Sequence, residues 1–146
     1  MSRPAKIKVL ALDLERTLID NAMSGQPRPG LDEFLHFCHQ QFERVAIFST
    51  VEEADARSVI SDLKMVGQVP SELFDRLEFI NWVGEFKDLS FVIDADPQEV
   101  LLIDDDEGWI RPDQRSLWLP IKAWDGGDDF ELKQVQKKLE SLLANR

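Results

Sequence analysis

An acid, a hydroxyl and a pair of acids each follow a short apolar stretch of this 146-residue sequence, at the point where the stretch ends. These residues are Asp13, Ser49 and the neighbours Asp104 and Asp105. A lysine, Lys87, precedes the acid pair. Carboxylates suit Mg²⁺, which typically takes one or two of them in proteins together with the oxygens of a substrate phosphate. If these side chains meet, their types point to phosphoryl transfer.

Asp13 is the residue whose position suits covalent chemistry. A carboxylate can attack phosphorus and form an aspartyl-phosphate, which splits one difficult displacement into two easier ones. Lys87, the Ser49 hydroxyl and a metal ion would compensate the charge on the transferring group. A second acid must protonate the leaving oxygen and then activate water. Glu15 lies two residues after Asp13, so both side chains point to the same side of an extended chain.

The stretches that precede these side chains are predicted to be strands of one sheet. They are residues 9–12, 45–48 and 100–103. Each is short and continuously apolar, which is typical of a strand buried in a parallel sheet. Because ligands of such sheets bind beyond the carboxyl ends of the strands, the side chains that follow should converge on one site. Weaker strands are predicted at residues 77–80 and 117–121, the second at a sheet edge because it contains Pro120.

Amphipathic helices are predicted between and after these strands. Apolar residues recur at helical spacing from Leu31 and from about Glu52, and Gly67 is the expected end of the second helix. Asp128 and Glu131 have the spacing of a capping box that opens a last helix. The alternation of strands and helices predicts an α/β sandwich around a parallel sheet.

The composition limits the partners of the chain. With 17 Lys and Arg against 28 Asp and Glu, the net charge is −11, which opposes non-specific binding to nucleic acid or to an anionic membrane. The single cysteine, Cys38, excludes an internal disulfide and fits a reducing compartment. No apolar run approaches membrane-spanning length, and residues 1–8 lack the apolar core of a signal peptide. We therefore expect one soluble, cytoplasmic domain over residues 1–146, of open oligomeric state.

The segment Asp13-Leu-Glu-Arg-Thr-Leu resembles the first motif of the haloacid dehalogenase superfamily, Asp-x-Asp-x-Thr. Ser49, Lys87 and the pair Asp104-Asp105 match the second, third and fourth motifs of that superfamily. Within it, the chain is similar to the small phosphatases that act on the C-terminal domain of RNA polymerase II, the FCP/SCP or NIF type. The segments that follow the order of that family are residues 28–35, 48–49, 87–90, 100–105 and 120–124.

The resemblance implies a Rossmann-like three-layer sandwich, Mg²⁺ as cofactor, and hydrolysis of phosphomonoesters through an aspartyl-phosphate. Asp13 would be the nucleophile and a metal ligand, and Glu15 the acid/base, with its backbone carbonyl on the metal. Asp105, with Asp104 beside it, would complete the metal site. The residues implied to position the phosphate are Thr17, Ser49, Thr50 and Lys87.

Two features depart from the pattern of that family. Position 15 is glutamate where the family has aspartate, and a carboxylate misplaced by about 1 Å can cost on the order of 100-fold in rate. Residues 51–86 are too short for the β-hairpin insert that the polymerase phosphatases use beside their substrate, which argues against the same specificity. No segment between the motifs is long enough for a cap domain. An open site suits a phosphoprotein or another large phosphoester, with small phosphoesters as the other option.

Two alternative functions follow from the same residues. A catalytically weak relative could bind a phosphorylated partner without turning it over, and Glu15 is the main argument for it. A receiver domain also combines an acid pair, a phosphorylated aspartate, a hydroxyl and a lysine, but there the acid pair comes first and the lysine last. In this chain the acid pair follows Lys87, which argues against a receiver domain. Trp82 and Trp109 are the tryptophans expected to line the site.

Overall fold

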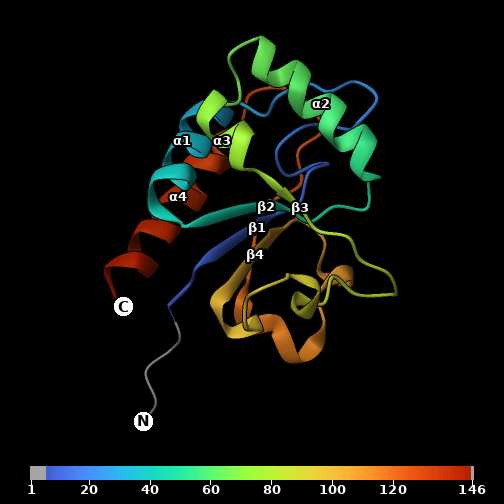
Figure 1. Ribbon diagram of the computed structural model, residues 1–146. Helices are drawn as coiled ribbons and strands as arrows, with labels where there is room; N and C mark the ends of the chain where they lie inside the picture. Colours follow the sequence, from blue (N-terminus) through green and yellow to red (C-terminus); the bar gives the residue numbers. More distant parts are fainter. Residues whose placement is uncertain (1–5, 146) are drawn as a thin grey trace.

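A five-stranded parallel sheet forms the centre of the computed structural model, which describes residues 6–145 (Figure 1). The strands are β1 (Val9–Leu12), β2 (Arg44–Ile47), β3 (Glu78–Phe79), β4 (Val100–Asp104) and β5 (Trp118–Pro120). They lie in the order β3-β2-β1-β4-β5, and every neighbouring pair is parallel. The five predicted strands are confirmed, and Pro120 lies on an edge strand, where its missing N–H costs no ladder bond.

Four α-helices cover one face of the sheet (Figure 1). They are α1 (Leu31–Gln41), α2 (Glu53–Met65), α3 (Ser71–Arg76) and α4 (Glu131–Ala144). Their apolar sides form one buried cluster with alternate strand residues, among them Leu10, Leu12 and Ile103. This cluster is the larger part of the core.

Short 3-10 helices cover the opposite face of the sheet. They are η1 (Leu89–Phe91), η2 (Pro97–Glu99), η3 (Glu107–Trp109) and η4 (Pro112–Leu117). The other set of strand residues, including Val9, Ala11 and Leu102, forms a second cluster with Leu89 and Ile110. Because successive side chains of a strand point to opposite faces, β1 is buried on both sides. The predicted three-layer sandwich is confirmed, with one outer layer made of 3-10 turns.

The helix boundaries differ from the prediction at the start of α4. The predicted capping box is wrong, because α4 begins at Glu131 and the Glu131 carboxylate accepts a hydrogen bond from the Lys122 N–H at 2.8 Å. Asp128 is exposed, and the neighbouring Asp129 carboxylate accepts a hydrogen bond from buried Arg28 at 2.6 Å. Asp129 and Glu131 therefore contact distant parts of the fold.

The end of α2 and the short helix after it show how local sequence sets the boundaries. Gly67 follows α2 with φ 79°, and its N–H donates to the Lys64 carbonyl at 3.0 Å, which confirms Gly67 as a helix stop. α3 was not predicted from the sequence. This helix has six residues after Pro70, too few for an apolar repeat to be recognised.

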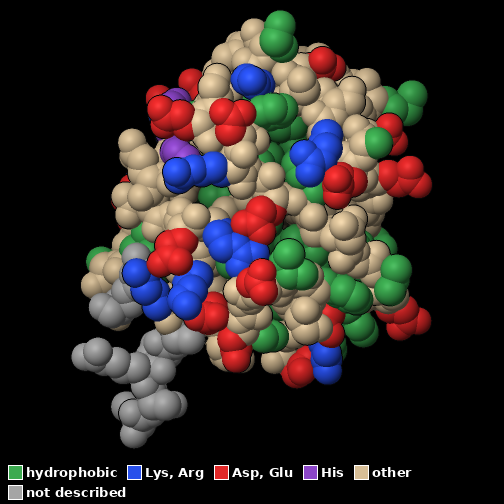
Figure 2. All heavy atoms as spheres, viewed as in Figure 1, with side chains coloured by type: hydrophobic (Ala, Val, Ile, Leu, Met, Phe, Trp, Pro, Cys, Tyr) green, Lys and Arg blue, Asp and Glu red, His purple; other side chains and the backbone are tan. Residues whose placement is uncertain are grey.

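Within residues 6–145, the connections that leave the strands at the carboxyl edge of the sheet contain no further α-helix. Between β3 and β4 the described chain forms only η1 and η2, and between β1 and α1 it forms a loop with isolated bridges at Glu15, Ile19 and Pro27. Across residues 6–145, no helix is both long and apolar enough to span a bilayer. On the face shown in Figure 2, acidic side chains are spread over the surface with apolar side chains exposed between them.

Candidate active site

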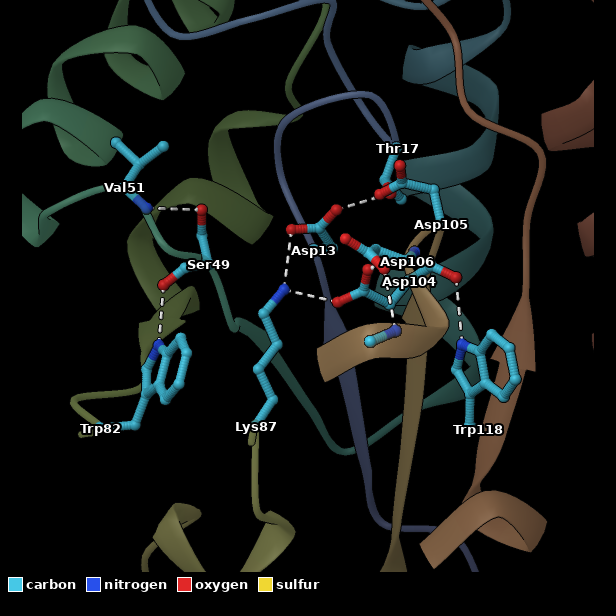
Figure 3. Close-up of polar contacts among 11 residues, drawn as sticks. Asp13, Thr17, Ser49, Val51, Trp82, Lys87, Asp104, Asp105, Asp106 and Trp118 are labelled. Carbon is cyan, nitrogen blue, oxygen red and sulfur yellow. Dashed lines mark hydrogen bonds and ion pairs between the residues drawn. The ribbon is translucent and has the colours of Figure 1, made fainter. Parts of the chain in front are cut away.

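Lys87 lies between two buried carboxylates at the carboxyl edge of the sheet (Figure 3). Its Nζ is 2.9 Å from Asp13 Oδ1 and 2.5 Å from Asp104 Oδ2. Asp13 directly follows β1 and Asp104 ends β4, and the Asp13 N–H donates to the Ile103 carbonyl at 2.9 Å, which extends the pairing of these neighbouring strands. The Lys87 side chain is only 1% exposed. The two strand ends and the lysine therefore form one buried ion triad.

Thr17 and Asp105 complete a group of oxygen atoms around Asp13. The Thr17 hydroxyl donates to Asp13 Oδ2 at 2.8 Å and lies 3.3 Å from Asp105 Oδ1. Asp13, Asp104 and Asp105 each offer one carboxylate oxygen, and these atoms lie within 4.8 Å of one another. Three hard oxygen donors at this spacing fit a Mg²⁺ ion. Both oxygens of Asp104 accept hydrogen bonds, because Oδ1 accepts the Asp106 N–H at 2.9 Å while Oδ2 pairs with Lys87.

Burial and charge shift the protonation equilibria of the triad. Burial raises the pKa of Asp13 to about 8, and repulsion from Asp104 adds to this while the Lys87 ammonium opposes it. Burial also raises the pKa of Asp104. Burial alone would lower the pKa of Lys87, but the carboxylates of Asp13 and Asp104 outweigh it and raise that pKa. A divalent cation at these carboxylates would favour their charged forms.

Three of the predicted site residues stand outside the group formed by the ion triad, Thr17 and Asp105. The Glu15 carboxylate accepts a hydrogen bond from the Ala22 N–H at 2.8 Å, so it contacts the loop that follows β1. Ser49 is nearly buried, and its hydroxyl accepts the Val51 N–H at 3.0 Å (Figure 3). Thr50 is exposed. The structure thus groups five of the predicted residues tightly and places Glu15, Ser49 and Thr50 in separate contacts.

A pocket of about 370 Å³ opens beside Ser49. Ser49 and Thr50 line it together with Trp82 and Trp109, which were the two tryptophans expected near the site. The Trp82 indole N–H donates to the Ser49 carbonyl at 2.8 Å (Figure 3). Two of the predicted phosphate-binding residues, Ser49 and Thr50, therefore line an open pocket with aromatic walls, whereas the residues of the ion triad do not line it.

Arg28 fixes the backbone of the loop that carries Thr17. Its guanidinium is completely buried and donates to the carbonyls of Arg16 and Thr17, each at 3.2 Å. It also donates to the Lys122 carbonyl at 2.7 Å and to Asp129 Oδ2 at 2.6 Å. Arg28 lies in one of the segments that follow the order of the family, residues 28–35, but no role was predicted for it. A buried arginine cannot be recognised from the sequence, because its four acceptors come from two distant segments.

Two further residues form hydrogen bonds next to the site residues, and these contacts were not predicted. The Trp118 indole donates to the Asp104 carbonyl at 3.0 Å, and no sequence pattern predicts this contact. Asp88, directly after Lys87, accepts three hydrogen bonds. The donors are the Ser90 N–H, the Gln114 side chain and the Arg111 guanidinium. Burial alone would raise the pKa of Asp88, but these hydrogen bonds outweigh it and lower the pKa to about 2.

The comparison with protein families matches residues 8–146 to NIF, the NLI interacting factor-like phosphatases. A comparison with curated proteins finds no significant match. The family match spans the ion triad, Thr17, Glu15 and the pocket, and it confirms the resemblance to phosphatases of the FCP/SCP or NIF type. The chain therefore belongs to the NLI interacting factor-like phosphatase family.

Proposed function

We propose that the chain is a Mg²⁺-dependent phosphomonoester hydrolase that works through an aspartyl-phosphate on Asp13. The family supports phosphatase activity. The observation that supports this mechanism is the environment of the Asp13 carboxylate, which pairs with Lys87 through Oδ1 and with the Thr17 hydroxyl through Oδ2. These contacts hold the carboxylate in one orientation at the open edge of the sheet, as a nucleophile requires.

Two steps account for the reaction. Asp13 attacks phosphorus, the phosphorus–oxygen bond to the alcohol breaks, and Glu15 gives a proton to the departing alkoxide. Water then attacks the phosphorus of the aspartyl-phosphate, Glu15 takes its proton, and phosphate leaves as Asp13 is restored. The Lys87 ammonium and the Thr17 and Ser49 hydroxyls, with Thr50 beside them, would orient and stabilise the phosphoryl oxygens.

The metal site of this proposal consists of Asp13, Asp104 and Asp105, with the Glu15 backbone carbonyl as a further ligand. The cluster of three carboxylate oxygens supports it. When bound, Mg²⁺ would compensate the negative charge of the carboxylates and of the transferring phosphoryl group. The substrate we propose is a phosphoprotein or another large phosphoester, because no described connection at this edge contains a further α-helix that would cover the site. A cytoplasmic location is part of the same proposal.

A second candidate function is the binding of a phosphorylated partner with little or no turnover. The contact between the Glu15 carboxylate and the Ala22 N–H favours it, because it engages the proposed acid/base away from the ion triad. Both functions use the same phosphate-binding residues, so only a measurement of turnover separates them.

The test is hydrolysis of p-nitrophenyl phosphate and of a panel of phosphoesters, with Mg²⁺ and with EDTA. We expect turnover only with Mg²⁺, and Asp13→Asn should lose more than about 1000-fold in rate because no covalent intermediate can form. Asp62→Asn, an exposed acid on α2, is the matched control and should behave as the parent does. Hydrolysis by Asp13→Asn at the parental rate contradicts the mechanism. Tight phosphopeptide binding without hydrolysis establishes the second function.

A further inference from the structure

The pocket beside Ser49 combines aromatic walls with an acidic rim. Its aromatic lining residues are Phe79, Trp82 and Trp109. Its charged lining residues are Glu52 and Glu53, and the described lining includes neither lysine nor arginine. A pocket of this composition attracts a positive charge, because aromatic faces and carboxylates both interact favourably with a cation.

Both tryptophans are attached to residues of the proposed phosphate site. The Trp82 indole donates to the Ser49 carbonyl at 2.8 Å, and the Lys87 N–H donates to the Trp109 carbonyl at 2.8 Å. The two indoles contact each other edge to face, with centroids 5.8 Å apart and planes at 79°. These contacts fix the aromatic walls relative to Lys87. Because the proposed phosphate-binding residues Ser49 and Thr50 line the pocket, a group in the pocket would belong to the part of the substrate next to the phosphate.

A cation of the protein already contacts two of the lining residues. The Arg57 guanidinium lies 4.2 Å from the centroid of the Phe79 ring and pairs with Glu53 at 2.9 Å. Arg57 thus compensates the charge of Glu53. Glu52 is exposed and has no ion-pair partner within the part of the chain that the structure describes, residues 6–145. The Glu52 carboxylate is therefore available to a cation that enters from solution.

We propose that this pocket binds a cationic group on the alcohol side of the phosphoester, namely a lysine or arginine side chain next to the phosphorylated residue of a peptide. The proposal rests on the proposed function for the position of the phosphate, and it adds the substrate class. The net charge of −11 supports it as well, because the field of the whole protein would draw a basic peptide towards the site.

The decisive experiment measures binding, so that it does not depend on turnover. The Asp13→Asn chain is titrated calorimetrically with three phosphoserine peptides that differ only in the residue after the phosphoserine, which is lysine, norleucine or glutamate. We expect the lysine peptide to bind about fivefold more tightly than the norleucine peptide, and the glutamate peptide to bind most weakly. Equal dissociation constants for the lysine and norleucine peptides, or no binding of any of them, overturn the proposal.

A matched pair of variants separates the pocket from the general charge of the protein. In the Asp13→Asn background, Glu52→Gln should remove most of the preference for lysine over norleucine. Asp55→Asn removes the same charge from an exposed position at the start of α2 outside the pocket lining, and it should keep the preference. A preference that survives Glu52→Gln means that the cation binds elsewhere and contradicts the proposal.

Two further measurements complete the test. The first asks whether the cation belongs to a peptide or to a small phosphoester, and the second separates the cation pocket from the proposed phosphatase function. Phosphoethanolamine and ethyl phosphate differ only by an amine, so tighter binding of phosphoethanolamine would support a cation pocket that serves small substrates. A preference confined to the peptides supports the phosphopeptide. Hydrolysis of p-nitrophenyl phosphate by the parent chain is measured alongside. A chain that prefers the lysine peptide yet hydrolyses nothing contradicts the phosphatase function and leaves the pocket established.

Discussion

Lys87 is the residue on which the charge balance of the site depends. Its ammonium is the cation between Asp13 and Asp104, and all three side chains are buried. Lys87→Met keeps the length of the side chain and leaves two buried carboxylates without their counter-charge. Removing one partner of a buried ion pair typically costs about 3–5 kcal/mol. We expect the free energy of unfolding in urea with EDTA to fall by about that amount, and hydrolysis to be lost.

Lys138→Met, an exposed position on α4, is the control for the loss of a positive charge. It should retain the stability and the activity of the parent. If Lys87→Met unfolds at the same urea concentration as Lys138→Met, the ion triad does not stabilise the fold. If Lys87→Met hydrolyses substrate as the parent does, Lys87 has no role in binding the phosphate.

Glu15 decides between an enzyme and a binding protein. Glu15→Gln keeps the size of the side chain but cannot exchange a proton, so it should lose roughly 10²–10⁴-fold in kcat. Glu15→Asp should also slow the reaction, by about 10- to 100-fold, because a shorter acid cannot reach the same position. The shorter side chain would also lose the observed contact of the Glu15 carboxylate with the Ala22 N–H at 2.8 Å.

Steady-state hydrolysis of p-nitrophenyl phosphate measures both Glu15 variants. A rate that rises in Glu15→Asp would indicate a site impaired by glutamate and would favour the binding function. Equal rates for the parent and Glu15→Gln would show that Glu15 is not the acid/base. Each of these outcomes would require a different mechanism.

The proximity of Asp13 and Asp104 could be predicted from the sequence, because both residues lie at the carboxyl ends of predicted strands. Apolar runs identify β1 and β4, and parallel neighbours bring Asp13 and Asp104 together. The individual hydrogen bonds could not be predicted in this way. The contact of Glu15 with Ala22 and the contacts of Arg28 depend on the path of a loop that has no periodic pattern.

Elements of regular periodicity were predictable, and short ones were not. The strands and the helices α1, α2 and α4 carry apolar repeats that their burial requires. A 3-10 helix of three residues has no such repeat, so the layer formed by η1 to η4 could not be recognised. The start of α4 was mispredicted because the Glu131 carboxylate accepts the Lys122 N–H instead of closing a capping box, and it is Asp129, not Asp128, that accepts the Glu131 N–H, at 3.3 Å.

Asp88 joins two elements of this 3-10 layer. It caps η1 through the Ser90 N–H and accepts a hydrogen bond from Gln114 in η4. Its pKa is about 2 in the folded protein, below the ordinary value of 3.8. Because the folded pKa is the lower one, this carboxylate contributes its stability above about pH 4 and loses it as the pH falls towards 2. Asp88→Asn should therefore lose less stability than the parent between pH 5 and pH 2.

Melting temperatures measured across this pH range compare Asp88→Asn with the parent and with Asp55→Asn, an exposed acid on α2. The buried carboxyl groups of the ion triad titrate in all three proteins, so the difference between variants isolates Asp88. Parallel curves for Asp88→Asn and the parent would mean that these hydrogen bonds do not stabilise the folded state. The Asp55→Asn curve should follow that of the parent.

The whole molecule carries an excess of negative charge, and part of it is concentrated in one crevice by Asp13, Asp104 and Asp105. A cation that binds only the folded state stabilises it by about 2.7 kcal/mol at 100 times its dissociation constant. For a chain of this size, this corresponds to a rise in the melting temperature of roughly 5–10 °C. We expect millimolar Mg²⁺ to produce such a rise, and Asp105→Asn to weaken it.

Sodium chloride at matched ionic strength is the control for screening of the net charge, and it should shift the melting temperature much less than Mg²⁺ does. Asp125→Asn removes an exposed charge outside the cluster and should respond to Mg²⁺ as the parent does. A melting temperature that stays constant across millimolar Mg²⁺ would exclude a stable metal site at these carboxylates.

The buried guanidinium of Arg28 makes the formation of the site depend on residues that are synthesised late. Its partners Lys122 and Asp129 lie 94 and 101 positions later in the chain, so they leave the ribosome long after the loop that carries Thr17. Domains generally fold as units during synthesis. A nascent chain that has completed β1 to β5 already contains every proposed site residue, yet the Arg28 guanidinium that holds its Thr17 loop lacks two of its four acceptors. Activity should therefore appear abruptly, only after residues 122–129 emerge.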